Sequence, residues 1–335
     1  MNSQSSLSSR ATEVYLEEKF QIQRAVVVQA SGPALQERAV ESVHKKEVLI
    51  RVEALGLCRT DLRVYDGKIP VAIPLVPGHE FAGVVECVGA DVTHVVCGDR
   101  VAINPVLACG DCPFCDDQLC QQTQFLGLDV NGACAEICKV PSSAVYKISK
   151  DLPFEVAAFA EPVAASLAVL NADIKRDQRG LLLGDNRIAV LTQRILQAFD
   201  FSNVAMASPE DLSSLEPHCF DYAIETLATT QTIRGLVRSV KPGGLVILKS
   251  RQQVPIELTL AELLPKNIKF QCVNYGRFDK ALDLLTTGEV EVRDLVGPAF
   301  GLSDFEEAFE YASENESSKT FIRPQLASIS ANGNR

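Results

Sequence analysis

The sequence predicts an α/β protein of two domains, a β-rich domain followed by a doubly wound parallel sheet. At 335 residues the chain is longer than one hydrophobic core usually serves. Short apolar segments separated by Gly- and Pro-containing turns occupy residues 24–150, which is typical of strands. After Pro153, apolar strands alternate with helical periodicity, which is typical of parallel strands covered by helices on both faces.

Ordered structure is predicted to begin near Arg24, because the Ser-rich segment before it lacks an apolar core. The predicted strands of the first half are 25–28, 47–52, 80–88, 100–103 and 134–140. A helix is predicted over 155–171, where Glu161, Pro162 and Ser166 interrupt the apolar run before it reaches the length of a membrane span.

The second half repeats strand and helix in turn. Its predicted strands are 180–183, 204–207, 221–225 and 245–248. A helix with apolar residues at helical spacing follows the first of them, over 188–199, and another covers 233–240. A further helix is expected to start at Ser208, because Ser208-Pro209-Glu210-Asp211 places a capping residue before a Pro in the first turn.

The charge of the chain excludes some classes of partner. Its 32 basic and 43 acidic residues give a net charge of −11. With no long basic block, the chain is not expected to bind nucleic acid or an anionic membrane. No secretory signal is recognisable, and four of the eleven cysteines cluster within twelve residues, so we expect a cytoplasmic, metal-binding protein rather than a disulfide framework.

Two groups of residues predict metal sites. Cys58 and His79 are of the types that zinc prefers, and a catalytic zinc needs a third protein ligand, for which Glu161 is a candidate. Each alone has a simpler explanation as a core or structural residue. The second group is four cysteines, which would close a structural tetrahedral site: Cys109, Cys112, Cys115 and Cys120.

A third pattern predicts a dinucleotide turn, although an imperfect one. Residues Gly184-Asp185-Asn186-Arg187-Ile188-Ala189 follow a strand and open a helix, where such sites carry G-x-G-x-x-G. Asn186 replaces the second Gly, so its side chain must point away from the phosphates. The acidic residue expected about 20 positions on, which would bind the adenosine ribose, is missing, and Ser208 stands at that strand tip.

Together these motifs resemble the zinc-dependent medium-chain alcohol dehydrogenases, in particular the polyol and threonine dehydrogenase-like branch. The likeness covers about residues 24–323, including Gly98–Val101 and the turn at Pro242–Gly244. It implies a GroES-like catalytic domain and a Rossmann cofactor domain. The implied boundaries are a flexible tail 1–23, a catalytic domain 24–165 with 293–324, a cofactor domain 166–292 and a flexible tail 325–335.

The resemblance also implies roles for particular residues. Cys58 and His79 match the first two catalytic zinc ligands, Glu161 the third, and Glu80 an acidic neighbour that binds the metal in parts of the family; the sequence does not decide between Glu80 and Glu161. Thr60 matches the hydroxyl that passes on the substrate proton, while Asp61 is expected to orient its neighbours. The resemblance also implies that Cys109, Cys112, Cys115 and Cys120 form the family's structural zinc lobe. In the family the fourth cysteine of this lobe usually lies eight residues after the third, whereas here the interval is five.

For the cofactor, the resemblance implies two zinc ions per chain and NAD or NADP. Arg59 and Lys319 match basic residues near the dinucleotide, alongside the residues of the Gly184–Ile188 turn and Ser208; a surface charge explains Arg59 equally well. The implied substrate is a small alcohol or carbonyl compound, with Tyr65 and Phe125 in its pocket, and the implied assembly is a homodimer or homotetramer. Two functions stay open: an NAD(P)-linked oxidoreductase, and a degenerate relative that keeps fold and zinc as a non-redox binding or assembly protein.

Overall fold

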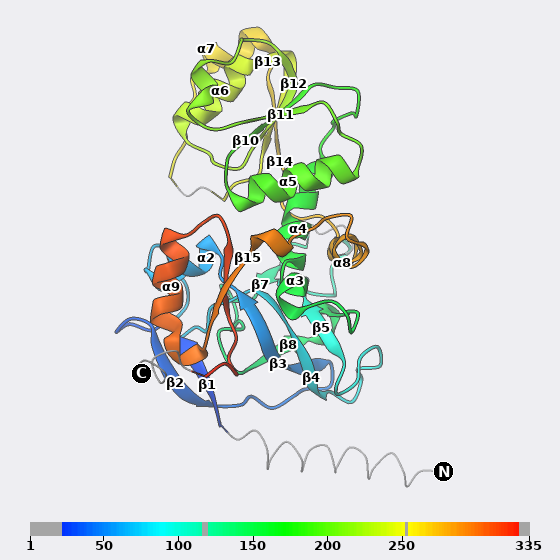
Figure 1. Ribbon diagram of the computed structural model, residues 1–335, viewed down its shortest axis with the longest axis vertical. Helices are drawn as coiled ribbons and strands as arrows, with labels where there is room; N and C mark the ends of the chain where they lie inside the picture. Colours follow the sequence, from blue (N-terminus) through cyan, green and yellow to red (C-terminus); the bar gives the residue numbers. More distant parts are fainter. Residues whose placement is uncertain (1–21, 116–119, 252–253, 328–335) are drawn as a thin grey trace. The chain divides into compact units, whose positions relative to one another are not determined.

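The computed structural model describes residues 22–115, 120–251 and 254–327, which divide between two compact units (Figure 1). Unit 1 ends its first segment at Glu161 and resumes at Arg293, and unit 2 spans Pro162–Val292. The first boundary thus follows residue 161 instead of residue 165. The predicted flexible tails lie mostly outside the described residues.

Unit 1 is built on a mixed seven-stranded sheet of order β15-β16-β3-β4-β5-β9, in which β8 also pairs with β3. Two small antiparallel sheets, β1-β2 and β6-β7, accompany it. The elements are β1 Ile22–Val27, β2 Ala34–Ala39, β3 Glu47–Gly56, α2 Arg59–Tyr65, β4 Glu80–Val88, β5 Arg100–Ile103, β6 Val106–Leu107, β7 Gln124–Phe125, β8 Ile137–Pro141, β9 Val145–Lys147, α3 Phe154–Ala158, β15 Val296–Phe300, α9 Phe305–Glu314 and β16 Lys319–Ile322.

The core of unit 1 lies between this sheet and the segments wrapped around it. Val48, Ile50 and Val52 lie at alternate positions of β3 and are fully buried in this core. Leu49, between them, is buried in a separate cluster with Cys87 and Ile137. Helix α9 adds residues at helical spacing, among them Phe305 and Phe309. The C-terminal segment of the chain therefore completes the core that the N-terminal segment begins.

Unit 2 holds a five-stranded parallel sheet of order β11-β10-β12-β13-β14. This order makes β11, which carries the expected ribose-binding tip, an edge strand. The elements are α4 Ala160–Leu167 (which begins in unit 1), β10 Gly180–Leu183, α5 Arg187–Ala198, β11 Val204–Ala207, β12 Phe220–Glu225, α6 Thr230–Ser239, β13 Val240–Leu248, α7 Leu260–Leu263, β14 Lys269–Cys272 and α8 Phe278–Thr287.

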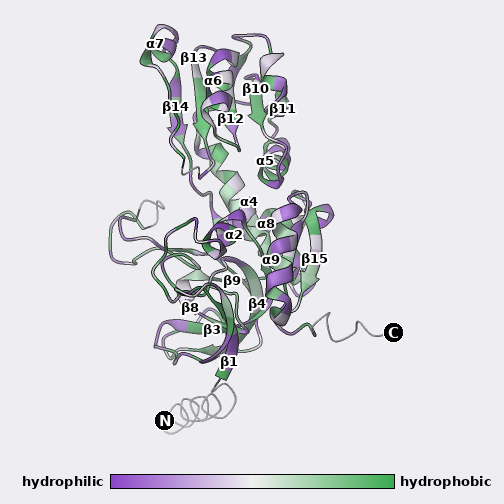
Figure 2. Ribbon diagram, turned by 90° about the vertical axis from the view of Figure 1, so that its left-hand side faces the viewer, coloured by the Kyte–Doolittle hydropathy of each residue, from purple (hydrophilic) through white to green (hydrophobic). Residues whose placement is uncertain are grey.

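Alternate residues of the unit 2 strands enter two different cores. Leu181 and Leu183 pack with Leu236 of α6, whereas Leu182 packs on the other face with Leu196 of α5. Burial on both faces explains why Gly180-Leu181-Leu182-Leu183 is a continuous apolar run instead of an alternating one. Figure 2 shows these strands largely in the hydrophobic colour, and α6 in both colours. The predicted doubly wound sheet and the β-rich first domain are confirmed.

Two predicted helices differ in the structure. The helix expected over 155–171 is divided into α3, α4 and a 3₁₀ turn at Ala168–Asn171, with Phe159 separating α3 from α4. The helix expected at Ser208 is only a 3₁₀ turn, Asp211–Ser213. The side chain of Asp211 accepts the Ser208 backbone N–H at 2.8 Å, a contact typical of a helix N-terminus, yet only this one 3₁₀ turn follows it.

By length and composition, the stretch Phe154–Asn171 is apolar enough to cross a membrane. Of this stretch, 72% is buried inside the protein, as in the core helix of a globular protein.

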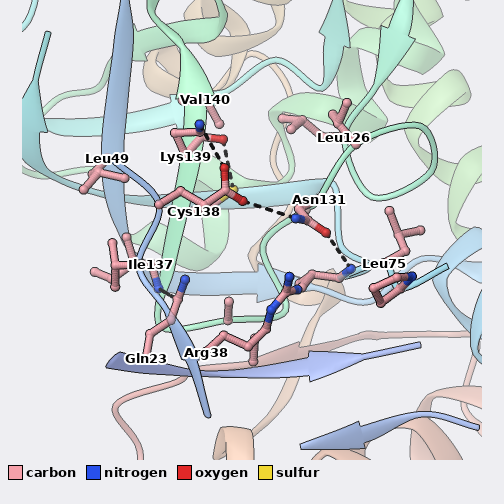
Figure 3. A pocket seen from close by; sticks show the side chains of 18 of the residues that line it. Gln23, Arg38, Leu49, Leu75, Leu126, Asn131, Ile137, Cys138, Lys139 and Val140 are labelled. Carbon is pink, nitrogen blue, oxygen red and sulfur yellow. Dashed lines mark hydrogen bonds and ion pairs between the residues drawn. The ribbon is translucent and has the colours of Figure 1, made fainter. Parts of the chain in front are cut away.

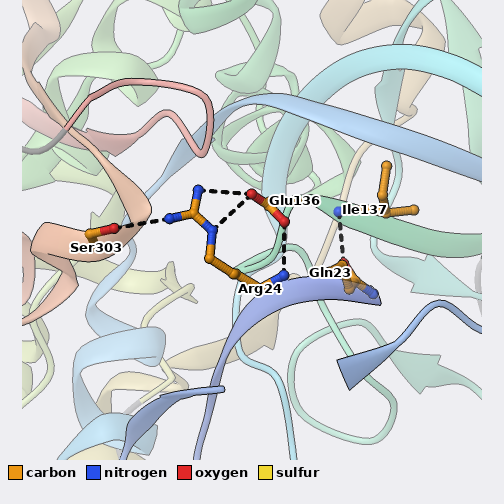
Figure 4. A network of polar contacts seen from close by, with 5 residues as sticks. All are labelled: Gln23, Arg24, Glu136, Ile137 and Ser303. Carbon is orange, nitrogen blue, oxygen red and sulfur yellow. Dashed lines mark hydrogen bonds and ion pairs between the residues drawn. The ribbon is translucent and has the colours of Figure 1, made fainter. Parts of the chain in front are cut away.

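A polar network joins the start of the described chain to its later segments in unit 1 (Figure 4). The Glu136 carboxylate accepts hydrogen bonds from the backbone N–H of Arg24 at 2.8 Å and from its guanidinium Nε and Nη2 at 3.0 and 2.8 Å. The third guanidinium nitrogen donates to Ser303 at 3.1 Å. Because Arg24 lies in β1 and Ser303 near the start of α9, this network links three segments that are distant in sequence.

We predict that Glu136→Ala lowers the free energy of unfolding by about 1–2 kcal/mol, because three donors on Arg24 lose one half-buried acceptor. Asp66→Ala, which removes the partner of an exposed Lys68 pair, is the matched control and should change it by less than about 0.5 kcal/mol. Denaturant unfolding of both variants measures the difference, and equal effects would contradict a role for the network.

Candidate functional site

The carboxylate of Asp61 organises the first candidate metal site. This side chain is 1% exposed and lies in the first turn of α2. Its Oδ2 accepts the backbone N–H of Cys58 at 2.9 Å, and its Oδ1 accepts that of Gly78 at 3.0 Å. Nδ1 of His79 lies 3.1 Å from the same Oδ1. One buried carboxylate therefore holds the loop that carries Cys58 and the turn that carries His79, as expected of an orienting residue.

Gly78 is required at this turn for two reasons. Its φ of +103° lies in the region that favours glycine. A Cβ on it would also meet a side-chain atom of Leu55 at 2.9 Å and the backbone of Cys134 at 3.0 Å. The close packing of the turn fixes the direction in which His79 leaves it.

Cys58, His79 and Glu80 form a cluster whose ligand atoms lie within 4.8 Å of one another. Burial alone would lower the pKa of His79, but the Asp61 charge and the neighbouring Cys58 outweigh it and raise that pKa well above its ordinary value. The cluster therefore favours positive charge at this point. A thiol, an imidazole and a carboxylate are also the donors that zinc takes, so these residues fit a zinc ion.

Glu80 has a second partner that the sequence did not reveal. Its Oε2 pairs with Nζ of Lys319, and both side chains are 3% exposed. Room for the lysine depends on Gly56, because a Cβ there would lie 2.6 Å from Cδ of Lys319. The structure thus places Lys319, predicted near the dinucleotide, in a buried ion pair beside the metal cluster. Its cofactor role stays a prediction.

The remaining residues predicted around this site are placed differently. Glu161 is buried in the first turn of α4 but lies outside the cluster that contains Glu80. Thr60 follows Cys58 in the first turn of α2 and is half-buried. Arg59 forms a surface ion pair with Glu316. The proton-transfer role of Thr60 and the cofactor role of Arg59 stay predictions.

Of the two aromatic residues expected in the substrate pocket, one adjoins the cluster. The ring of Phe125 meets the ring of His79 edge-on at 5.2 Å. Tyr65 instead stacks on Phe309 of α9 at 4.4 Å. Phe125 therefore remains the better placed of the two for contact with a substrate.

The four lobe cysteines come together as the second candidate metal site. Their sulfur atoms all lie within 4.8 Å of one another, and the Cys109–Cys115 and Cys112–Cys115 separations are 3.6 and 3.4 Å. A tetrahedral ion with metal–sulfur bonds of about 2.3 Å requires separations near 3.8 Å, so the donor set fits zinc. The shortened interval before Cys120 does not keep that residue out of the cluster.

The thiols of this cluster are already unequal without a metal. A hydrogen bond from the backbone N–H of Cys109 lowers the pKa of Cys120 to about 6. Hydrogen bonding with Cys112 raises the pKa of Cys115 to about 11. Because zinc binds thiolates, the lowered pKa of Cys120 favours metal binding by this sulfur.

In unit 2, the predicted dinucleotide turn connects β10 to α5. Gly184 has a φ of +135°, and a Cβ on it would lie 2.1 Å from Oγ1 of Thr226. Asn186 is extended (φ −85°) and caps α5 by accepting the N–H of Ala189 at 3.1 Å. Its amide also donates to Oγ1 of Thr226 at 3.0 Å. The second glycine is therefore not needed for backbone conformation, and Asn186 is fixed by contacts within the protein.

The other residues of the predicted turn lie where the sequence places them. Asp185 is exposed, and Arg187 and Ile188 open α5. The backbone N–H of Gly184 donates to the carbonyl of Ala207 at 2.9 Å, which sets the turn directly beside the tip of β11 and Ser208. The hydroxyl of Thr226 donates to the carbonyl of Leu183 at 2.9 Å and accepts from Asn186. This residue was missed because it follows a third strand, β12.

A separate cavity of 520 Å³ lies in unit 1, and none of the predicted site residues lines it (Figure 3). Three charged residues that line it form ion pairs: Nζ of Lys139 lies 2.9 Å from Oε2 of Glu41 and 3.5 Å from Oε2 of Glu47. Asn131 donates to Glu41 at 3.3 Å and accepts the N–H of Val76 at 3.0 Å. These polar groups are largely satisfied by one another.

The chain is similar in sequence to known dehydrogenases. Residues 44–150 match the family described as "Alcohol dehydrogenase GroES-like domain". An alcohol dehydrogenase of Geobacillus stearothermophilus is 44% identical over 143 residues, which are 40% of this chain and 42% of that protein. An L-threonine 3-dehydrogenase of Symbiobacterium thermophilum is 26% identical over 88% of this chain and 95% of its own.

Solved structures show the same fold. A zinc-binding dehydrogenase of Sinorhizobium meliloti, solved with NADP, matches with a TM-score of 0.82 at 23% identity and covers 90% of this chain and 99% of its own. At this level of identity the match concerns the fold alone.

We predict two zinc ions per chain, one for each cluster. Cys112→Ala should leave one zinc and lower the melting temperature, because a closed structural site contributes to folding. Cys58→Ala should also leave one zinc but melt close to the wild type. Elemental analysis combined with thermal melting measures both, and an equal loss of stability in the two variants would contradict this division of roles.

Proposed function

Since the chain belongs to the zinc-dependent medium-chain alcohol and polyol dehydrogenase family, we propose that it is an oxidoreductase that transfers hydride between an alcohol or polyol and NAD(P). In the reverse direction it would reduce the matching aldehyde or ketone. The observation that carries the proposal is the buried cluster of Cys58, His79 and Glu80 around the Asp61 carboxylate.

Each component of this site has a defined task. Zinc would supply a Lewis acid that eases loss of the alcohol proton, and NAD(P) would take the hydride. Cys58 and His79 would hold the metal, with Glu80 or Glu161 as the further carboxylate ligand. Thr60, two residues after Cys58, would relay the hydroxyl proton of the substrate, taking it up as its own hydroxyl proton passes onward to solvent. Asp61 positions both ligands and does not contact the substrate.

Unit 2 would hold the dinucleotide at the turn after β10. Gly184 lets the backbone approach the phosphates, and the N-terminus of α5 favours their negative charge. Asn186 already takes the N–H of Ala189 and thereby removes one of the donors that a phosphate would otherwise use. We therefore expect binding weaker than that of a turn with all three glycines.

The finer parts of the proposal are assembly and location. Dehydrogenase relatives support a small-molecule alcohol or carbonyl substrate. We further propose a homodimer or homotetramer without nucleic acid or membrane partners. All eleven cysteines are free thiols, which supports a cytoplasmic protein.

The test is to titrate the zinc-loaded protein with NADH and NADPH by fluorescence and then to assay oxidation of sorbitol, 2,3-butanediol and L-threonine. Cys58→Ala should reduce turnover by at least about a hundredfold while leaving dinucleotide binding intact, because it acts on the metal alone. Cys97→Ala, which removes an exposed thiol outside both clusters, is the matched control and should behave as the wild type.

Absence of binding of either nucleotide at millimolar concentration would overturn the proposal. The non-redox reading, for which the comparisons give no support, would then replace it.

A further inference from the structure

The tip of β11 carries a carboxylate that the sequence pattern does not place there. Asp211 lies three residues after Ser208, at the start of the 3₁₀ turn that replaces the expected helix. Its Oδ2 accepts both the backbone N–H and the hydroxyl of Ser208, each at 2.8 Å. Its Oδ1 has no hydrogen-bond partner among the described residues. The turn thus folds an acidic group back onto the strand tip.

This tip adjoins the dinucleotide turn. The N–H of Gly184 donates to the carbonyl of Ala207, the residue before Ser208, at 2.9 Å. In doubly wound sheets the pyrophosphate lies at the first turn and the adenosine ribose at the tip of the second strand, where an acidic residue binds the ribose 2′-hydroxyl. Asp211 reaches this position from the following turn.

We propose that Asp211 is the residue that selects NAD over NADP, by accepting a hydrogen bond from the 2′-hydroxyl of the adenosine ribose and repelling a 2′-phosphate. This inference rests on the proposed function, because it needs a dinucleotide at this site. It supplies, from the following turn, the acidic residue that the sequence lacks at the end of the strand.

The charges around the tip support the same selection. Residues 208–217 contain three acidic residues, Glu210, Asp211 and Glu216, and no basic one. Arg238 of α6 donates to the backbone carbonyls of Leu212 and Ser213 in the following turn. Arg187 at the start of α5 already has an interaction of its own within the protein. A 2′-phosphate would therefore meet negative charge without a dedicated basic partner.

The Ser208 contacts also keep the carboxylate charged. The two hydrogen bonds from Ser208 lower the pKa of Asp211. Ser208 thus contributes through Asp211, since its hydroxyl is already engaged.

The experiment is fluorescence titration of the zinc-loaded full chain with NADH and NADPH, which differ only by the 2′-phosphate. The wild type should bind NADH at least about tenfold more tightly, the value of one hydrogen bond to a charged group. Asp211→Asn, which keeps the shape but removes the charge, should bring the two dissociation constants within about threefold of each other. A purely structural role would weaken both nucleotides equally and leave their ratio unchanged.

Glu210→Gln is the matched control. It removes the same charge from the neighbouring residue, whose side chain does not make the Ser208 contacts. It should leave the ratio within about twofold of the wild-type value. Two results would overturn the assignment of selectivity to Asp211 but not the proposed function. One is an equal change of the NADH/NADPH ratio in both variants, and the other is wild-type protein that binds NADPH as tightly as NADH. Failure of the wild type to bind either nucleotide would overturn the proposed function and this inference with it.

Discussion

Two segments of unit 1 converge on the carboxylate of Asp61: the loop after β3, and the turn before β4, which also carries the imidazole of His79. A buried carboxylate is costly unless its oxygens are satisfied, and here each oxygen accepts a backbone N–H. The same group raises the pKa of His79 against the effect of burial. The geometry of the metal cluster, and with it the proposed chemistry, depends on this one acceptor.

A second buried charge adjoins the first and comes from the far end of the chain. Lys319 begins β16, which pairs with β3 and so brings the lysine beside Gly56 and Glu80. A buried ion pair is weak evidence for stability, because removing both charges from water costs about as much as their attraction returns. This ion pair instead fixes the position of the Glu80 carboxylate, because Lys319 is held beside it by the fold itself.

The predictability of each feature follows from how local its cause is. The spacing of four cysteines within twelve residues predicted one metal site, and the residue types and family resemblance of Cys58 and His79 predicted the other. The structure brings both sets together. The alternation of strands and helices gave the doubly wound sheet, because burial on two faces leaves a readable apolar pattern. The partner of Glu80 could not be found in this way, since it lies 239 residues along the chain.

The errors also have local causes. Ser208-Pro209 has the composition of a helix start, and Asp211 does accept the Ser208 N–H as a capping contact would, but the chain makes only one 3₁₀ turn there. The spacing of Ser208 and Asp211 was a usable signal, because a side chain three residues on often reaches back to a capping residue. Asn186 was expected to point its side chain away from the phosphates, and the structure shows what holds it: it caps α5 in an extended conformation and bonds to Thr226.

The most direct test of the role assigned to Asp61 is the zinc content of Asp61→Asn after dialysis against a weak chelator. If this carboxylate positions Cys58 and His79, the variant should keep the zinc of the cysteine lobe and lose the other, so that its content falls from about two ions per chain to about one. Circular dichroism checks that the variant is folded. A folded Asp61→Asn protein that retains both ions as firmly as the wild type would contradict the account.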